Sequence, residues 1–121
     1  MRILFIHQNF PGQYLHIVQR LAQHGNHQLV ALGINELDRN RPLPDSLNYF
    51  RYRLDRGNTK GVHPLVMETE TKMIRAEGCA RAAEQLKLKG FTPDVILAHP
   101  GWGEPMFCLL YTSDAADDRL S

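Results

Sequence analysis

Two short segments combine histidine with glycine and proline, and they hold the residue types best suited to chemistry. Residues 7–12 read His-Gln-Asn-Phe-Pro-Gly, and residues 99–103 read His-Pro-Gly-Trp-Gly. A histidine at the end of a strand can orient a hydroxyl group or stabilise developing charge as a hydrogen-bond donor. His99 is therefore the candidate catalytic residue and His7 a candidate binding residue. The alternative for both is a histidine satisfied by a backbone carbonyl.

Gly12 stands where a helix is expected to begin. Backbone N–H groups and the helix dipole favour an anion such as phosphate at that point, and a glycine allows a ligand to approach the backbone closely. The alternative is a plain turn that needs glycine to bend. The three spaced glycines of the dinucleotide-binding fingerprint do not occur here, which argues against a nicotinamide or flavin dehydrogenase.

Trp102 and Glu104 are further candidates for contact with a sugar. The Trp102 ring can pack on a sugar face or on the helix below it, and Glu104 can accept hydrogen bonds from sugar hydroxyls or serve as an acidic residue early in a helix. Arg51, Arg53 and Arg56 lie at or near a two-residue period. They are either a patch for an anionic acceptor or the solvated face of a strand.

No metal site is expected from the sequence. His24 and His27 span the end of a helix and the start of a strand, and no cluster of cysteines or carboxylates accompanies them. Cys79 sits in an alanine-rich helical stretch and reads as a small buried residue.

The elements that must position these residues follow from hydrophobic periodicity. Residues 2–7 and 27–33 are predicted to be buried strands, and the apolar residues between them recur at helical spacing, with Gly25 as a left-handed cap. These 33 residues form a βαβ unit with a right-handed crossover.

The remaining pattern continues the same architecture. A third strand is expected at 47–54, a helix or two helices joined near Gly78 at 64–89, and a fourth strand at 95–98. The fold class is α/β, a Rossmann-like parallel sheet with helices on both faces. With strand order 3-2-1-4, the order reverses between the first and fourth strands, where segments 7–12 and 99–103 both begin.

The composition excludes several classes of protein. The chain has 121 residues and a formal net charge of +1, with 43% hydrophobic and 22% charged residues. Such values indicate one globular domain and give no electrostatic case for a nucleic-acid partner. No apolar run approaches the ~20 residues of a membrane span, and the first residues are too quickly polar for a signal peptide. Two cysteines make no disulfide framework, so a cytoplasmic location is expected.

The end of the chain differs from the rest. Residues 108–118 read Cys-Leu-Leu-Tyr-Thr-Ser-Asp-Ala-Ala-Asp-Asp, which resembles the translation of a transposase-type sequencing adapter. We therefore divide the chain into residues 1–107, part of a natural domain, and residues 108–121, a non-native tail. The alternative is a genuine short acidic tail. Without that tail the chain loses one arginine and three aspartates, and its net charge becomes +3.

Two stretches carry a family resemblance. Residues 1–14, Met-Arg-Ile-Leu-Phe-Ile-His-Gln-Asn-Phe-Pro-Gly-Gln-Tyr, and residues 98–104, Ala-His-Pro-Gly-Trp-Gly-Glu, resemble the amino-terminal domain of bacterial family-4 glycosyltransferases with the GT-B fold. The segments at 51–57 and 63–64 are similar as well. The resemblance covers residues 1–107.

The resemblance implies a two-domain enzyme that transfers a sugar from a nucleotide-sugar to a saccharide or lipid-linked acceptor with retention of configuration. This chain would supply the acceptor side of the cleft, with Gly12 against the donor phosphates and His99 near the transferred sugar. Neither cofactor nor metal is implied, and a peripheral membrane contact is a further expectation. The donor-binding carboxyl-terminal domain is absent, so this fragment alone is expected to be inactive. The alternative is a stand-alone Rossmann- or flavodoxin-like module that binds nucleotide or phosphate without transfer.

Overall fold

Four parallel strands form the centre of the protein. The computed structural model describes residues 1–98 apart from 38, 39, 41 and 55. The strands are β1 (Arg2–Ile6), β2 (Gln28–Gly33), β3 (Leu47–Arg51) and β4 (Val95–Ala98). They lie in the order β3-β2-β1-β4, and every pair is parallel. The predicted α/β class is confirmed, and the strand order is the 3-2-1-4 order that the sequence analysis assumed.

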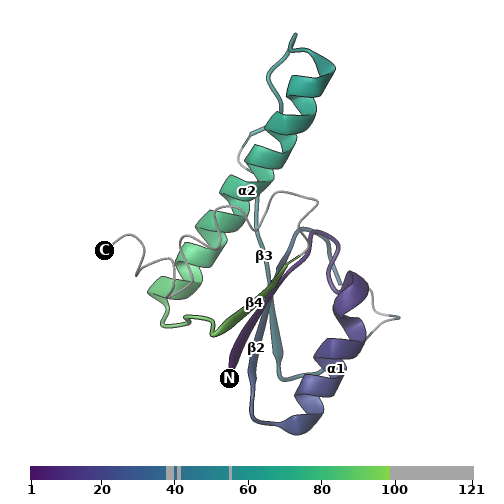
Figure 1. Cartoon of the computed structure of the whole chain (residues 1–121), viewed down its shortest axis with the longest axis vertical. Helices are drawn as coiled ribbons and strands as arrows, with labels where there is room; N and C mark the ends of the chain where they lie inside the picture. Colours follow the sequence, from purple (N-terminus) through teal and green to yellow (C-terminus); the bar gives the residue numbers. More distant parts are fainter. Residues whose placement is uncertain (38–39, 41, 55, 99–121) are drawn as a thin grey trace.

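The sheet is covered on both faces, because successive residues of each strand point to opposite sides. One face packs on α1 (Leu15–His24) and the other on α2 (Pro64–Leu88), as Figure 1 shows. The two faces have separate buried clusters. The cluster on the α1 side contains Ile3, Phe5, Phe10, Tyr14, Val18, Leu29, Ala31 and Leu47. The cluster on the α2 side contains Leu4, Ile6, Val30, Leu32, Tyr52, Cys79, Ala83, Leu86 and Phe91.

The first helix begins later than the sequence pattern predicts. Gly12 opens a short 3-10 turn, η1 (Gly12–Tyr14), and the α-helix itself starts at Leu15. The helix ends as predicted at Gly25, whose φ of 72° is left-handed and whose N–H donates to the carbonyl of Ala22. The backbone amides at Gly12 therefore belong to a tight turn rather than to the first turn of an α-helix.

Helix α2 is one continuous element of 25 residues, about 37 Å long. His63 caps its start by accepting a hydrogen bond from the backbone N–H of Leu65, and Pro64 occupies the first turn. The described buried residues of α2 all lie between Ile74 and Leu86. Figure 1 shows the amino-terminal half of α2 extending well beyond the sheet.

Strand β3 ends at Arg51, three residues before the predicted end. Tyr52 still donates its N–H to the carbonyl of Gly33, but its ring is buried in the cluster under α2. The next residue then crosses close to the helix, since a Cβ added to Gly78 would lie 2.7 Å from the carbonyl oxygen of Arg53. Gly78 thus allows this crossing and does not interrupt α2.

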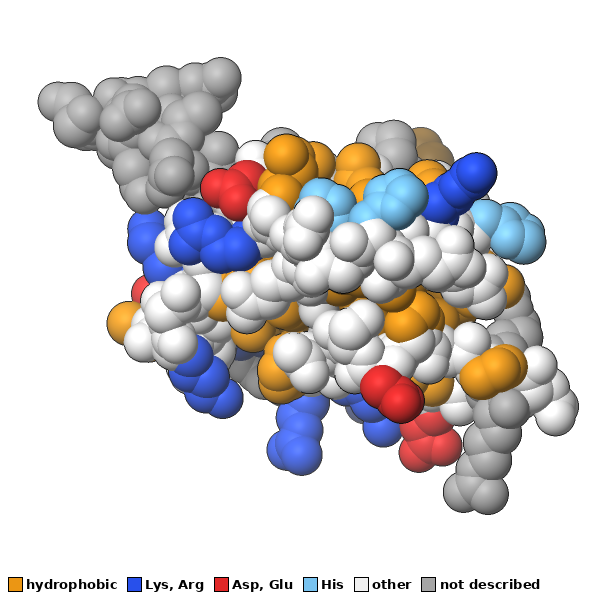
Figure 2. All heavy atoms as spheres, turned by 90° about the horizontal axis from the view of Figure 1, so that it is seen from below, with side chains coloured by type: hydrophobic (Ala, Val, Ile, Leu, Met, Phe, Trp, Pro, Cys, Tyr) orange, Lys and Arg blue, Asp and Glu red, His pale blue; other side chains and the backbone are white. Residues whose placement is uncertain are grey.

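Figure 2 views the molecule from the end at which the strands begin. Basic, acidic and histidine side chains are spread over this face between neutral ones. In the described part of the chain, no helix is both long and apolar enough to cross a membrane.

Candidate functional site

The carboxyl ends of the four parallel strands lie at one edge of the sheet. The candidate site residues come in the loops that begin at this edge. Ile6 pairs with Leu32 on one side and with Ala98 on the other, and Gly33 pairs with Arg51. Open α/β sheets bind ligands beyond this edge, at the point where the strand order reverses. Here the reversal falls at β1, between β2 and β4.

The loop after β1 is tightly folded. His7 donates its backbone N–H to the carbonyl of Leu32, and the carbonyl of His7 accepts from Phe10 at 3.2 Å. The Phe10 ring is completely buried and stacks on Tyr49 with 5.6 Å between ring centroids. The peptide bond between Phe10 and Pro11 is cis. The loop thus turns back over the end of β1, and the stacked rings of Phe10 and Tyr49 pack beneath it.

The structure brings the two predicted binding residues of this loop together. A Cβ added to Gly12 would lie 2.6 Å from Nε2 and 2.7 Å from Cε1 of His7, so the imidazole ring packs directly against the glycine. Gly12 also has a φ of +49°, which side-chain-bearing residues rarely adopt. Glycine is needed here for both backbone conformation and space.

The His7 ring has a defined orientation. Its Nδ1 accepts a hydrogen bond from the backbone N–H of Asn9 at 3.0 Å. The ring lies nearly perpendicular to the Tyr14 ring, with 5.9 Å between the centroids. An accepting Nδ1 assigns the proton of the neutral ring to Nε2. The ring thus supports the loop from within, next to Gly12.

Residues after β2 hold the same loop from the other side. Gln8 accepts hydrogen bonds at its carbonyl from the N–H groups of Ile34 and Asn35, and the Asn35 amide donates to the carbonyl of Phe10. The Tyr49 hydroxyl donates to the carbonyl of Asn35 at 2.7 Å. Burial raises the pKa of Tyr49 to about 12, although nearby Arg51 lowers it, so this donor keeps its proton at neutral pH.

Sequence reasoning missed Asn35 and Tyr49. The sequence pattern predicts only a loop at Asn35 and a strand at Tyr49. No motif or periodicity in the sequence indicates that either residue contacts Phe10. The contact depends on the order of the strands, because β3 must lie beside β2 for the Tyr49 hydroxyl to reach the loop that follows β2.

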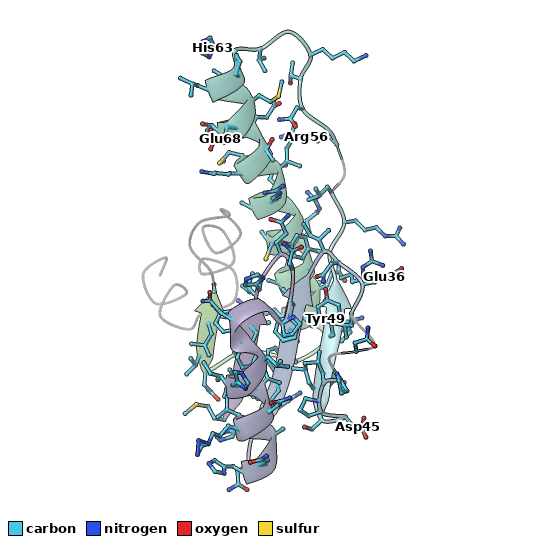
Figure 3. All side chains as sticks on the ribbon, turned by 90° about the vertical axis from the view of Figure 1, so that its right-hand side faces the viewer. Glu36, Asp45, Tyr49, Arg56, His63 and Glu68 are labelled. Atoms are coloured by element: carbon cyan, nitrogen blue, oxygen red, sulfur yellow. The ribbon has the colours of Figure 1, made fainter. Side chains whose placement is uncertain are left out.

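The three arginines considered together in the sequence are separated by the structure. Arg51 and Arg53 line one hollow of about 570 Å³, with Ile34, Tyr52 and Leu54. Arg56 instead forms an ion pair with Glu77 of α2 at 3.0 Å. Figure 3 shows Glu36 and Tyr49 at the carboxyl end of the sheet, Asp45 at the opposite end, and Arg56, His63 and Glu68 along the projecting part of α2.

The other predicted site residues follow β4. His99, Trp102 and Glu104, as well as the tail at 108–121, lie outside the described residues. Ala98 ends β4 opposite Ile6, so His99 follows β4 in the chain as His7 follows β1. Among the residues that the structure describes, no three His, Cys, Asp or Glu side chains gather into a potential metal site.

The fold and the edge define the class: a Rossmann-like α/β domain whose first loop is built around a glycine at the carboxyl end of a parallel sheet. Comparison with protein families gives the particular family. A family model described as the glycosyl transferase family 4 group matches residues 25–110. The chain belongs to this family. No curated protein and no solved structure matches it.

Proposed function

We propose that this chain is the acceptor-side part of a retaining glycosyltransferase that acts in the bacterial cytoplasm. In this proposal a second domain, encoded beyond residue 107, binds the nucleotide of a nucleotide-sugar. The bond between sugar and diphosphate breaks, and a new glycosidic bond forms to an oxygen of a saccharide or lipid-linked acceptor. Family membership supports glycosyl transfer in general. One observation about the described residues supports the placement of the site: β1 and β4 end side by side, at the reversal of the strand order.

The loop at residues 7–12 would form the phosphate-facing wall of the cleft. The donor diphosphate would lie against the backbone of this turn, on the side of Gly12 away from the His7 ring. The imidazole of His7 fills the space behind Gly12, and the Asn9 N–H fixes the orientation of that ring. His7 and Gly12 thus bind the donor as a preorganised unit, whose geometry is fixed before substrate arrives.

The residues after β4 would act on the sugar. His99 donates a hydrogen bond near the transferred sugar, Glu104 accepts hydrogen bonds from its hydroxyls, and the Trp102 ring packs on its face. Charge on the leaving diphosphate is stabilised mainly by groups of the second domain, so the fragment alone would not transfer sugar. No cofactor takes part, and the acceptor could bring a peripheral contact with the membrane.

The decisive experiment measures sugar transfer by the protein with its second domain restored. Wild-type protein is incubated with a panel of nucleotide-sugars and saccharide or lipid-linked acceptors, and the product's anomeric configuration is read by NMR. We expect His99→Ala to reduce transfer by about 100-fold or more. His24→Ala is the matched control, because His24 is exposed at the far end of α1.

The outcomes separate the alternatives. Equal transfer by wild type and His99→Ala would remove the catalytic role of His99. If the restored protein transfers no sugar but the isolated chain binds nucleotide in calorimetry, the stand-alone binding module is the better interpretation. The division at residue 107 is tested by the nucleotide sequence across codons 104–121, since codons that differ from the adapter would make the tail genuine.

A further inference from the structure

The hollow beside the β1 loop has the features of a binding site that the family match does not assign. It measures about 570 Å³ and is lined by Ile34, which follows β2, and by Arg51, Tyr52, Arg53 and Leu54, at and after the end of β3. All of these residues lie at the carboxyl edge of the sheet, because Gly33 and Arg51 are paired at the last position of the two strands. The hollow is therefore on the ligand-binding side of the fold.

Two guanidinium groups give this hollow a positive charge. The Nε of Arg51 donates to the carbonyl of Ile34 at 2.8 Å, which orients the planar group at the rim and leaves its outer nitrogens as donors. Glu36 is the acidic neighbour among the described residues, 3.7 Å from Nη1 of Arg51, and its side chain is largely exposed. Arg53 is exposed, and the structure gives it no carboxylate partner within the described part of the chain.

The chemistry of these groups selects a phosphate. A guanidinium offers parallel N–H donors that match two oxygens of one phosphate, and a pair of arginines neutralises its double charge. We infer that the hollow holds a phosphate group carried by the acceptor, either the monoester of a sugar phosphate or the phosphate that joins a lipid to its saccharide. This inference rests on the proposed function, because it names the acceptor of that transfer.

The position of the hollow fits an acceptor subsite. Ile34 connects the two sites directly: its N–H donates to the carbonyl of Gln8 in the β1 loop, and its carbonyl accepts from Arg51. A phosphate bound by Arg51 and Arg53 would therefore be separated from the β1 loop by a single residue, Ile34. Binding there anchors one end of the acceptor and leaves the other end to present its hydroxyl toward Gly12.

The other hollows among the described residues differ from this one in their lining. A hollow of about 470 Å³ lies between α1 and the segment before β3. The described residues that line it carry no charge: Gln19, Ala22, Gln23, Pro42, Leu43, Pro44 and Ser46. A smaller hollow of about 180 Å³ shares Arg51 and adds mainly apolar neighbours, namely Leu32, Phe50, Ala82 and Leu86, with Gln85 and Lys89. An alkyl chain attached to the phosphate could enter this smaller hollow, which lets the two acceptor sources be distinguished.

The test is an NMR titration of the 121-residue chain with two probes, inorganic phosphate and hexyl phosphate, at constant ionic strength. We expect the Nε–Hε signals of Arg51 and Arg53 to shift with phosphate. Arg53→Gln should raise the Kd about tenfold, the change expected for losing one charge-assisted contact. Arg20→Gln is the matched control, because Arg20 is an exposed arginine of α1 and the substitution removes the same charge.

A second variant guards against an indirect effect. Arg51→Lys keeps the charge but loses the planar fork, so it should also weaken phosphate binding, whereas a purely electrostatic attraction would leave the Kd unchanged and overturn the inference. Unchanged binding in Arg53→Gln, or shifts confined to residues 7–12, would overturn it as well. Tighter binding of hexyl phosphate than of inorganic phosphate assigns a lipid-linked acceptor, and equal binding assigns a sugar phosphate.

The transfer assay keeps this inference separate from the proposed function. If the restored enzyme transfers sugar but neither arginine affects phosphate binding, the acceptor inference fails alone. If phosphate binds through Arg51 and Arg53 but no transfer occurs with any donor, the proposed function fails and the anion site remains. Binding of UDP to the protein with its second domain restored should be the same in wild type and Arg53→Gln, because Arg53 lines the hollow and not the β1 loop.

Discussion

The two halves of α2 belong to one helix but differ in how they contact the rest of the protein. The carboxyl-terminal half packs its buried residues, from Ile74 to Leu86, on the sheet. The amino-terminal half extends beyond the sheet with Leu65, Val66 and Met67 exposed, and polar contacts with Asn58 and Thr59 hold it. The carboxyl-terminal half therefore contributes to the stability of the whole domain and positions the hollow lined by Arg51 and Arg53. The amino-terminal half is an arm that is stabilised by its own local contacts.

The largest expected difference is between two aliphatic residues of this helix. Ile74 is 4% exposed and Leu65 is 69% exposed. Ile74→Ala leaves a cavity and should lower the free energy of unfolding by about 2–5 kcal/mol. Leu65→Ala removes a side chain that is mostly in water and should stay within about 0.5 kcal/mol. Urea denaturation followed by circular dichroism measures both, and equal losses would show that the arm is as integral as the packed half.

A smaller effect is expected at Gly78, where the packed half of α2 meets the segment after β3. Alanine is intrinsically better than glycine inside a helix by about 1 kcal/mol. Here the added Cβ would lie 2.7 Å from the backbone oxygen of Arg53 and 3.3 Å from Leu54, so the segment must move. Gly78→Ala should therefore destabilise the protein by about 1–3 kcal/mol and weaken phosphate binding at the hollow.

Gly57→Ala is the matched control for Gly78→Ala. Nothing lies within 4 Å of a Cβ at Gly57, so its substitution should leave both stability and phosphate binding nearly unchanged. A Gly78→Ala protein as stable as wild type would mean that the contact with Arg53 relaxes without cost, and that α2 does not position the hollow.

Much of this architecture could be predicted from the sequence, because hydrophobic periodicity and the rules of parallel sheets act locally. They predicted the four strands and the left-handed cap at Gly25, which are confirmed, and the order assumed for the strands is the one observed. The role of Gly78 was not predictable in this way. A glycine inside a helical pattern suggests a break, and only the path of residues 52–54 across α2 reveals that it permits close packing.

The candidate site, too, was predictable from the sequence in some features and not in others. The carboxyl edge and the residues His7 and Gly12 followed from topology, whereas the contact between them depends on a tight turn that the spacing does not encode. The arginines suggested an anionic partner, but the hollow also needs Ile34, which follows β2, and Arg56 pairs with Glu77 instead. The roles of His99, Trp102 and Glu104 stay predictions.

The smallest expected effect concerns the arm and its response to pH. Glu70 accepts hydrogen bonds from the N–H and the hydroxyl of Thr59, at 2.6 and 2.7 Å, and from the Asn58 amide. These bonds, the Thr59 N–H first among them, lower the pKa of Glu70 below its ordinary value. The stabilisation of the arm is therefore present above the ordinary pKa of glutamate and is lost as pH falls through the lower, folded pKa.

In the folded chain the Thr59 amide signal in NMR should accordingly titrate with a midpoint below about 4.3, the ordinary glutamate value. Glu70→Gln should abolish that titration, while Glu68→Gln removes the same charge from the same half of α2 and should leave it in place. Signals from the packed half, such as Cys79, should not follow this titration. If they did, the two halves of α2 would open together, and the arm would be coupled to the sheet that carries the site.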